Sequence, residues 1–140
     1  MAERTRQALT DAEVQDMRAL EPSRRNRLLL RLLYSTGLRP SALCALSWGD
    51  LEESNDAGQL IIVGRGGQLR FVPLQTPVWE ELQAFRGRAG DREFVFRSRL
   101  GGPLSPRQVD RIVRSAARRA RISRPVSPRM LRYVRNRSHP

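Results

Sequence analysis

One arginine in the sequence stands at a predicted corner between two helices, where it could bind an anion. It lies in the run Thr-Gly-Leu-Arg-Pro at residues 36–40, in which Gly37 suits a left-handed helix cap and Pro40 suits the first turn of a new helix. A guanidinium beside a helix N-terminus favours a phosphate, because the helix dipole, the backbone N–H groups and the fixed charge all attract negative charge. The same pattern also fits an ordinary helix–turn–helix corner, so this stretch alone leaves both interpretations of Arg39 open.

A second set of arginines recurs every three or four residues in a helix predicted over residues 106–121. Ser105 and Pro106 form a typical helix start, and the arginines face away from a stripe of valine, isoleucine and alanine. Like charges on one face repel each other, so the row favours a polyanionic partner, with a merely solvated face as the alternative. The arginines of this row are Arg107, Arg111, Arg114, Arg118 and Arg121.

The composition also indicates a polyanionic partner. The chain has 140 residues and a formal net charge of +12, and all 26 basic residues are arginine. Nucleic acid fits such a charge better than a membrane surface does, although a GC-rich genome also enriches arginine. Because lysine is absent and arginine holds its proton tightly, no lysine can act here as an acid, a base or a nucleophile.

The remaining composition predicts a cytoplasmic protein. The single cysteine, Cys44, lies in an apolar helical run and is interpreted as a buried core residue, and no disulfide can form within the chain. The sequence has no signal peptide and no apolar run of about 18 residues. We therefore expect no membrane partner, and we expect neither a metal nor a cofactor.

The hydrophobic pattern predicts one α+β domain that is mainly helical and has a small three-stranded antiparallel sheet. We expect a flexible lead over residues 1–9, the domain over 10–134 and a flexible tail over 135–140. Strands are predicted at 59–63 and 69–74, joined by a glycine-rich turn, with a short third strand at 94–96 and a loop over 51–58. Helices are predicted over 11–20, 23–36, 40–47, 77–87 and 106–121, with a further helix starting at Ser127-Pro128.

The predicted helices at 11–20 and 23–36 have clear signatures. Thr10 and Glu13 form a capping box at the start of the first. In the second, the leucines share one buried face, and Arg24, Arg27 and Arg31 are expected to form one exposed stripe.

Three motifs, taken in this order, resemble the catalytic domain of the tyrosine recombinase (phage integrase) family. They are Thr-Gly-Leu-Arg at 36–39, the hairpin Gly-Arg-Gly-Gly-Gln-Leu-Arg-Phe-Val-Pro-Leu at 64–74, and Ser-Pro-Arg-Met-Leu-Arg at 127–132. The resemblance covers residues 8–134 and corresponds to roughly the first two-thirds to three-quarters of that domain. It implies DNA integration and site-specific recombination, in which a tyrosine attacks the scissile phosphate and cationic groups stabilise the charge on the phosphate oxygens.

The resemblance also implies roles for individual residues. Arg39 matches the first catalytic arginine and Arg132 the second, and together they would clamp a phosphate. Arg65 stands where the family has its general-acid lysine, and Arg129 stands at a His/Lys position; arginine is a poor general acid at both. The expected DNA contacts are Arg70 of the hairpin together with Arg107, Arg111, Arg114 and Arg118.

The tyrosines do not match the family's nucleophile. Tyr133 directly follows Arg132 and Tyr34 lies in a leucine-rich helix, so both are interpreted as structural. The sequence ends before the segment that supplies the nucleophile in the family. We therefore expect a truncated catalytic domain that binds double-stranded DNA and is inactive alone.

The alternative function is a binding-only regulator or decoy at recombination sites. An intact recombinase or a second copy of the chain is a further candidate partner. RNA binding fits less well, because exposed aromatic residues that could stack on bases are scarce.

Overall fold

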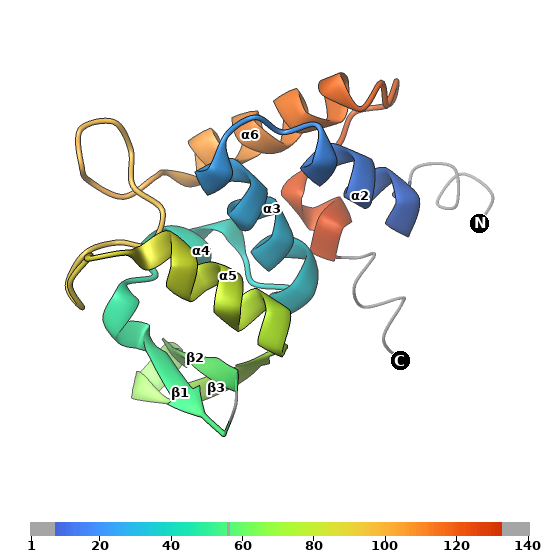
Figure 1. Ribbon diagram of the computed structural model, residues 1–140. Coiled ribbons are helices and arrows are strands. Elements are labelled where there is room, and N and C mark those ends of the chain that lie inside the picture. The colour runs from blue at the N-terminus through green and yellow to red at the C-terminus, as the bar shows by residue number, and fades with distance from the viewer. Residues whose placement is uncertain (1–7, 56, 133–140) are drawn as a thin grey trace.

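The computed structural model describes residues 8–55 and 57–132, in which helices cover one face of a small sheet (Figure 1). Residues 128–132 are also helical. This arrangement confirms the predicted fold class. The elements follow in the order α2 (Asp11–Ala19), α3 (Arg24–Thr36), α4 (Pro40–Ala45), the 3-10 turn η1 (Trp48–Asp50), β1 (Leu51–Ser54), β2 (Ala57–Val63), the 3-10 turn η2 (Arg65–Gly67), β3 (Leu69–Leu74), α5 (Thr76–Arg86) and α6 (Pro106–Arg119).

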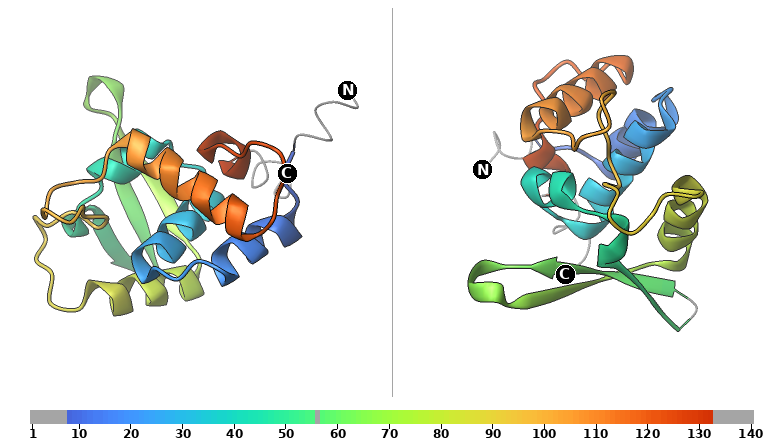
Figure 2. Two further views of the ribbon diagram at one scale, coloured as in Figure 1. Left: turned by 90° about the horizontal axis from the view of Figure 1, so that it is seen from above. Right: turned by 90° about the vertical axis from the view of Figure 1, so that its left-hand side faces the viewer.

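The sheet is an antiparallel meander in the order β1-β2-β3. Its helix-covered face carries Leu60 opposite Val72, and both side chains are buried. Its other face carries the pair Val63 and Leu69, which are 68% and 57% exposed. Figure 2 shows on its right-hand side that the helices lie above this sheet and leave its lower face uncovered in the described part of the chain.

The core is centred on α3. Its five leucines at positions 28, 29, 30, 32 and 33 are fully buried, as the predicted apolar face requires. Burial of one such side chain contributes about 1.5–3 kcal/mol to the stability of the folded state. Cys44 is buried as a free thiol among these side chains, and burial raises its pKa, so its predicted place in the core is confirmed.

The corner after α3 has the predicted geometry. Gly37 adopts a left-handed conformation with φ 69°, and its N–H donates to the Leu33 carbonyl at 3.3 Å. Arg39 then occupies the N-cap position of α4, and Pro40 is the first helical residue. The chain therefore passes from α3 into α4 through a short turn, with Arg39 exposed at it.

The prediction of a third strand at 94–96 is wrong. The third strand is β1, within residues that were expected to form a loop. An edge strand obtains its hydrogen bonds from one neighbour, so the polar Leu51–Ser54 can pair with β2 without an apolar alternation. Residues 94–96 pair instead with the segment before η1, through a Ser47–Phe94 bridge and a 3.0 Å bond from Val95 N–H to the Leu46 carbonyl.

The prediction of one exposed arginine stripe on α3 is also wrong. Arg24 is exposed, but Arg27 donates to the Glu21 carbonyl at 2.8 Å and Arg31 forms an ion pair with Glu81. These contacts hold α3 to its surroundings, and the ion pair offsets the charge of Arg31.

The ends of two predicted segments also differ. Arg121 lies beyond the end of α6, in a left-handed conformation with φ 60°. Leu9, which the predicted lead includes, is fully buried, so packing begins before residue 10. Residues 1–7 and the predicted tail at 135–140 lie outside the described residues. Among the helices that are described, none is long and apolar enough to cross a membrane.

Candidate nucleic-acid interface

Arg132 is held directly against the α3–α4 corner. The helix at 128–132 begins at the buried Pro128, and Leu131 is fully buried in the core. Arg132 Nε donates to the Gly37 carbonyl at 2.7 Å. This bond joins two residues that lie 95 positions apart in the sequence, and its acceptor, Gly37, stands two positions before Arg39 in the corner.

Among residues 8–55 and 57–132, the charged groups that act on Arg132 are cations. Burial lowers the pKa of its guanidinium, and repulsion from Arg39, Arg129 and Arg70 lowers it further. An arginine stays protonated at neutral pH despite such shifts. We call these four residues, Arg39, Arg70, Arg129 and Arg132, the arginine cluster. Such a concentration of positive charge can bind an anion such as a phosphate group.

Three local rules position the four members of the arginine cluster. Arg39 is placed by the glycine corner. Arg129 and Arg132 are three apart on one short helix and therefore share a face. Arg70 lies opposite Ile62 in the sheet, on the same face as the buried Val72, so the strand alternation directs it toward the helices.

Arg65 is separate from this group. It lies in the turn η2, is exposed, and is not among the groups that perturb Arg132. The structure therefore brings together Arg39, Arg129 and Arg132 from the predicted catalytic set but leaves Arg65 at the hairpin tip.

The exposed face of α6 carries four of the predicted DNA contacts. Arg107, Arg111, Arg114 and Arg118 are exposed, and Val109 and Val113 on the opposite face are fully buried. Arg114 forms an ion pair with Asp110 at 2.9 Å, which offsets part of its charge. This face therefore offers a row of guanidinium groups, of which Arg114 is partly neutralised.

The tyrosines and metal-ligating residues add no second site to the described chain. The Tyr34 hydroxyl donates to Asp11 Oδ1 at 2.7 Å, so it is engaged with the start of α2. Tyr133 lies outside the described residues. Over residues 8–55 and 57–132, no group of three or more His, Cys, Asp or Glu residues gathers in a way that could hold a metal ion.

Two features of the arginine cluster were missed by reasoning from sequence. Arg70 was expected to contact DNA, but not to lie beside Arg132. Arg70 stands two residues before the apolar Val72, and alternate residues of a strand share a face. This spacing could have predicted that Arg70 lies on the helix-covered face of the sheet. The Gly37 carbonyl as an acceptor for Arg132 depends on tertiary packing, and no local pattern indicates it.

Known sequences with the same organisation are recombinases. A sequence model of the phage integrase family matches residues 7–135. Tyrosine recombinase XerC of Xanthomonas campestris pv. campestris (strain B100) is 40% identical over 111 residues, covering 78% of this chain and 34% of the relative. Tyrosine recombinase XerD of Mycobacterium tuberculosis (strain CDC 1551 / Oshkosh) is 37% identical over 117 residues, covering 78% and 37%. The chain thus spans about a third of the length of these relatives.

Solved recombinase structures share the fold. The XerA recombinase superposes with a TM-score of 0.80 at 22% identity, covering 94% of this chain and 49% of that one. The XerH site-specific recombinase bound to its difH substrate gives 0.77 at 23%, covering 91% and 41%. The lambda integrase catalytic core gives 0.73 at 22%, covering 93% and 81%. Because the family match extends over most of the sequence and the fold is shared, this chain belongs to the phage integrase family of tyrosine recombinases.

Proposed function

We propose that this chain binds double-stranded DNA and that the arginine cluster holds one backbone phosphate. The observation that carries the proposal is the bond from Arg132 Nε to the Gly37 carbonyl at 2.7 Å, which holds Arg132 at the corner that bears Arg39, where Arg39, Arg129 and Arg70 all repel its charge. A phosphate would relieve this repulsion and form charge-assisted hydrogen bonds with the guanidinium groups. Family membership supports DNA as the source of the phosphate.

The exposed arginines of α6 would contact further phosphates of the same duplex. Their spacing along one helix face suits contacts with the regularly spaced charges of a DNA backbone. Such contacts add affinity without reading sequence, because phosphates carry no base identity. The choice of a recombination site would then depend on other contacts.

We also propose that the 140-residue chain binds DNA without cleaving it. Expulsion of a 5′ oxygen needs a proton donor, and Arg65 and Arg129 hold their protons too tightly for that role. Tyr34, the tyrosine within the described residues, is bonded to Asp11. The same observations favour a regulator or decoy at recombination sites, acting beside an intact recombinase or a second copy of the chain.

Loss of Arg39 should weaken DNA binding more than loss of an ordinary surface arginine. Arg39→Ala removes charge-assisted hydrogen bonds, so the dissociation constant for a short duplex should rise about 10-fold to 100-fold at fixed salt. Fluorescence anisotropy measures this. Arg88→Ala is the matched control, since Arg88 is exposed in the loop after α5, and less than a threefold change is expected there. Equal losses would mean that bulk charge alone determines binding.

Arg18, on α2, is unsuitable as that control. It is half-buried, and burial lowers its pKa, with repulsion from Arg31 adding to the effect. Its removal would therefore disturb packing as well as surface charge.

Removal of two α6 arginines should reduce the salt dependence of binding. In Arg111→Gln/Arg118→Gln, the slope of log affinity against log salt should fall by about 2, because each phosphate contact contributes about 0.9. The double variant Arg88→Gln/Arg92→Gln loses the same charge from the exposed loop after α5 and should keep the original slope. An unchanged slope in the α6 variant would make that face a solvated surface.

The chain should form no covalent adduct with DNA. A nicked suicide duplex traps any tyrosine-linked intermediate, which then runs as a slower band on a denaturing gel. We expect no such band for the 140-residue chain under conditions in which it binds the same duplex. A band that disappears on phenylalanine substitution of a tyrosine would show cleavage and exclude the binding-only function.

A further inference from the structure

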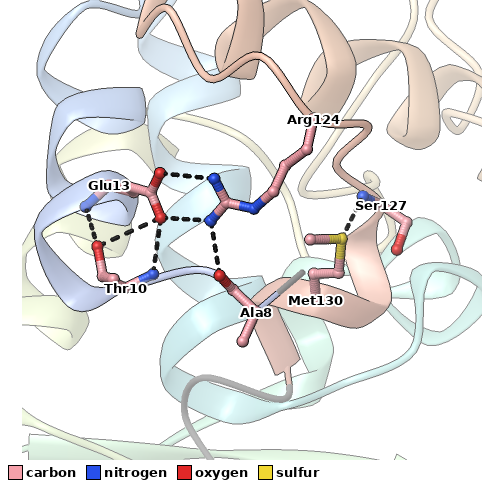
Figure 3. Close-up of polar contacts among 6 residues, drawn as sticks. All are labelled: Ala8, Thr10, Glu13, Arg124, Ser127 and Met130. Carbon is pink, nitrogen blue, oxygen red and sulfur yellow. Dashed lines mark hydrogen bonds and ion pairs between the residues drawn. The ribbon is translucent and has the colours of Figure 1, made fainter. Parts of the chain in front are cut away.

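An ion pair anchors the segment that leads into the helix at 128–132. Arg124 lies in this segment, between α6 and the helix, and its side chain reaches the start of α2 (Figure 3). Its Nη1 donates to Glu13 Oε2 at 3.0 Å, and its Nη2 donates to Glu13 Oε1 at 2.6 Å. Nη2 also donates to the Ala8 carbonyl at 2.6 Å. These contacts tie the guanidinium to Glu13 and to the backbone just before α2.

Glu13 is itself held in place. Its carboxylate accepts from the Thr10 N–H at 3.0 Å, and its own N–H donates to the Thr10 hydroxyl at 3.1 Å, which completes the capping box of α2. The neighbouring Leu9 is fully buried. Arg124 therefore contacts a rigid platform.

The pair differs from an ordinary surface ion pair. Both side chains are only about a quarter exposed, at 27% and 26%. The contact is bidentate, the geometry in which arginine and carboxylate bind most specifically. Accordingly, the hydrogen bonds from Arg124 lower the pKa of Glu13, and Glu13 raises the pKa of Arg124.

The anchor lies where the structure needs one. Arg39 and Arg70 repel Arg132, and this repulsion opposes the position of the helix at 128–132 beside the corner. Pro125 and Pro128 restrict the backbone between the anchor and this helix, so the constraint is transmitted along the chain. Burial of Leu131 and the bond from Arg132 to Gly37 complete the attachment.

We propose that Arg124 and Glu13 are positioning residues, whose ion pair holds the helix at 128–132 so that Arg132 lies within the arginine cluster. This inference rests on the proposed function, since it assigns the pair a role in phosphate binding. Neither residue contacts the phosphate itself. Their effect on DNA affinity is exerted through the placement of Arg132.

The substitution Glu13→Gln distinguishes a positioning role of the ion pair from an effect of net charge on DNA binding. It raises the net charge by one, so a purely electrostatic account predicts equal or tighter DNA binding. If the ion pair positions Arg132, the variant should instead bind a short duplex about fivefold to tenfold more weakly. Its amide hydrogen exchange over 129–132 should also become at least tenfold faster. Arg124→Gln should give the same acceleration of exchange.

Arg119→Gln is the matched control. It removes one arginine charge and breaks an ion pair with the buried Glu21 at 2.9 Å, but it leaves the 120–127 segment attached to α2. It should lower global stability in urea without selectively accelerating exchange over 129–132.

The outcomes distinguish the positioning role of Arg124 and Glu13 from phosphate binding by the arginine cluster. Unchanged exchange over 129–132 in both Glu13→Gln and Arg124→Gln would overturn the positioning role. Faster exchange with unchanged or tighter DNA binding would confirm the anchor and overturn the assignment of the phosphate to the arginine cluster. If Glu13→Gln does not fold, Arg124→Lys provides the test, because it keeps the charge and replaces the bidentate contact by a single one. Less than twofold change in both readouts there would overturn the proposal.

Discussion

The structure depends on holding like charges together around Arg132. The guanidinium groups of Arg39, Arg70 and Arg129 act on it, and each raises the free energy of the cluster in the absence of an anion. The fold compensates through packing, with Leu131 in the core and Arg132 Nε bonded to the Gly37 carbonyl. Because the free protein already holds these charges together, a phosphate bound there as proposed would form new hydrogen bonds and also relieve the repulsion. This preorganisation is the physical basis of the proposed DNA binding.

The scaffold brings the charges of the arginine cluster together from three elements. The buried leucines of α3 fix the helix that ends at the glycine corner, and the sheet presents Arg70 on its helix-covered face. The helix at 128–132 returns from the far end of the described chain to the same corner. Figure 1 shows this helix, in red, beside the lower end of α3. The cluster therefore exists only when the local elements pack correctly, which makes it a sensitive reporter of the whole domain.

Local features were predictable from sequence, and long-range ones were not. Gly37 and Pro40 encode the corner, and Ser105 and Pro106 encode the start of α6, because caps depend on neighbouring residues alone. The edge strand β1 was missed because its pairing partner, and not its own composition, makes it a strand. The contact between Arg124 and Glu13 spans 111 residues, and no spacing rule links two such positions. Strand alternation determines the sheet face on which Arg70 lies, but its place in the arginine cluster also depends on how the helices pack over that face.

The most direct test of the central claim is nuclear magnetic resonance of arginine side chains during titration with a short DNA duplex. Arg132→Lys assigns the Nε–H signal of Arg132, which should remain hydrogen bonded to Gly37 throughout. Binding of a phosphate by the arginine cluster predicts saturable shifts of this side chain and of the backbone amides at 37–39, together with those of α6. Shifts confined to α6, with the signals of Arg132 and the corner unchanged at saturation, would contradict the account.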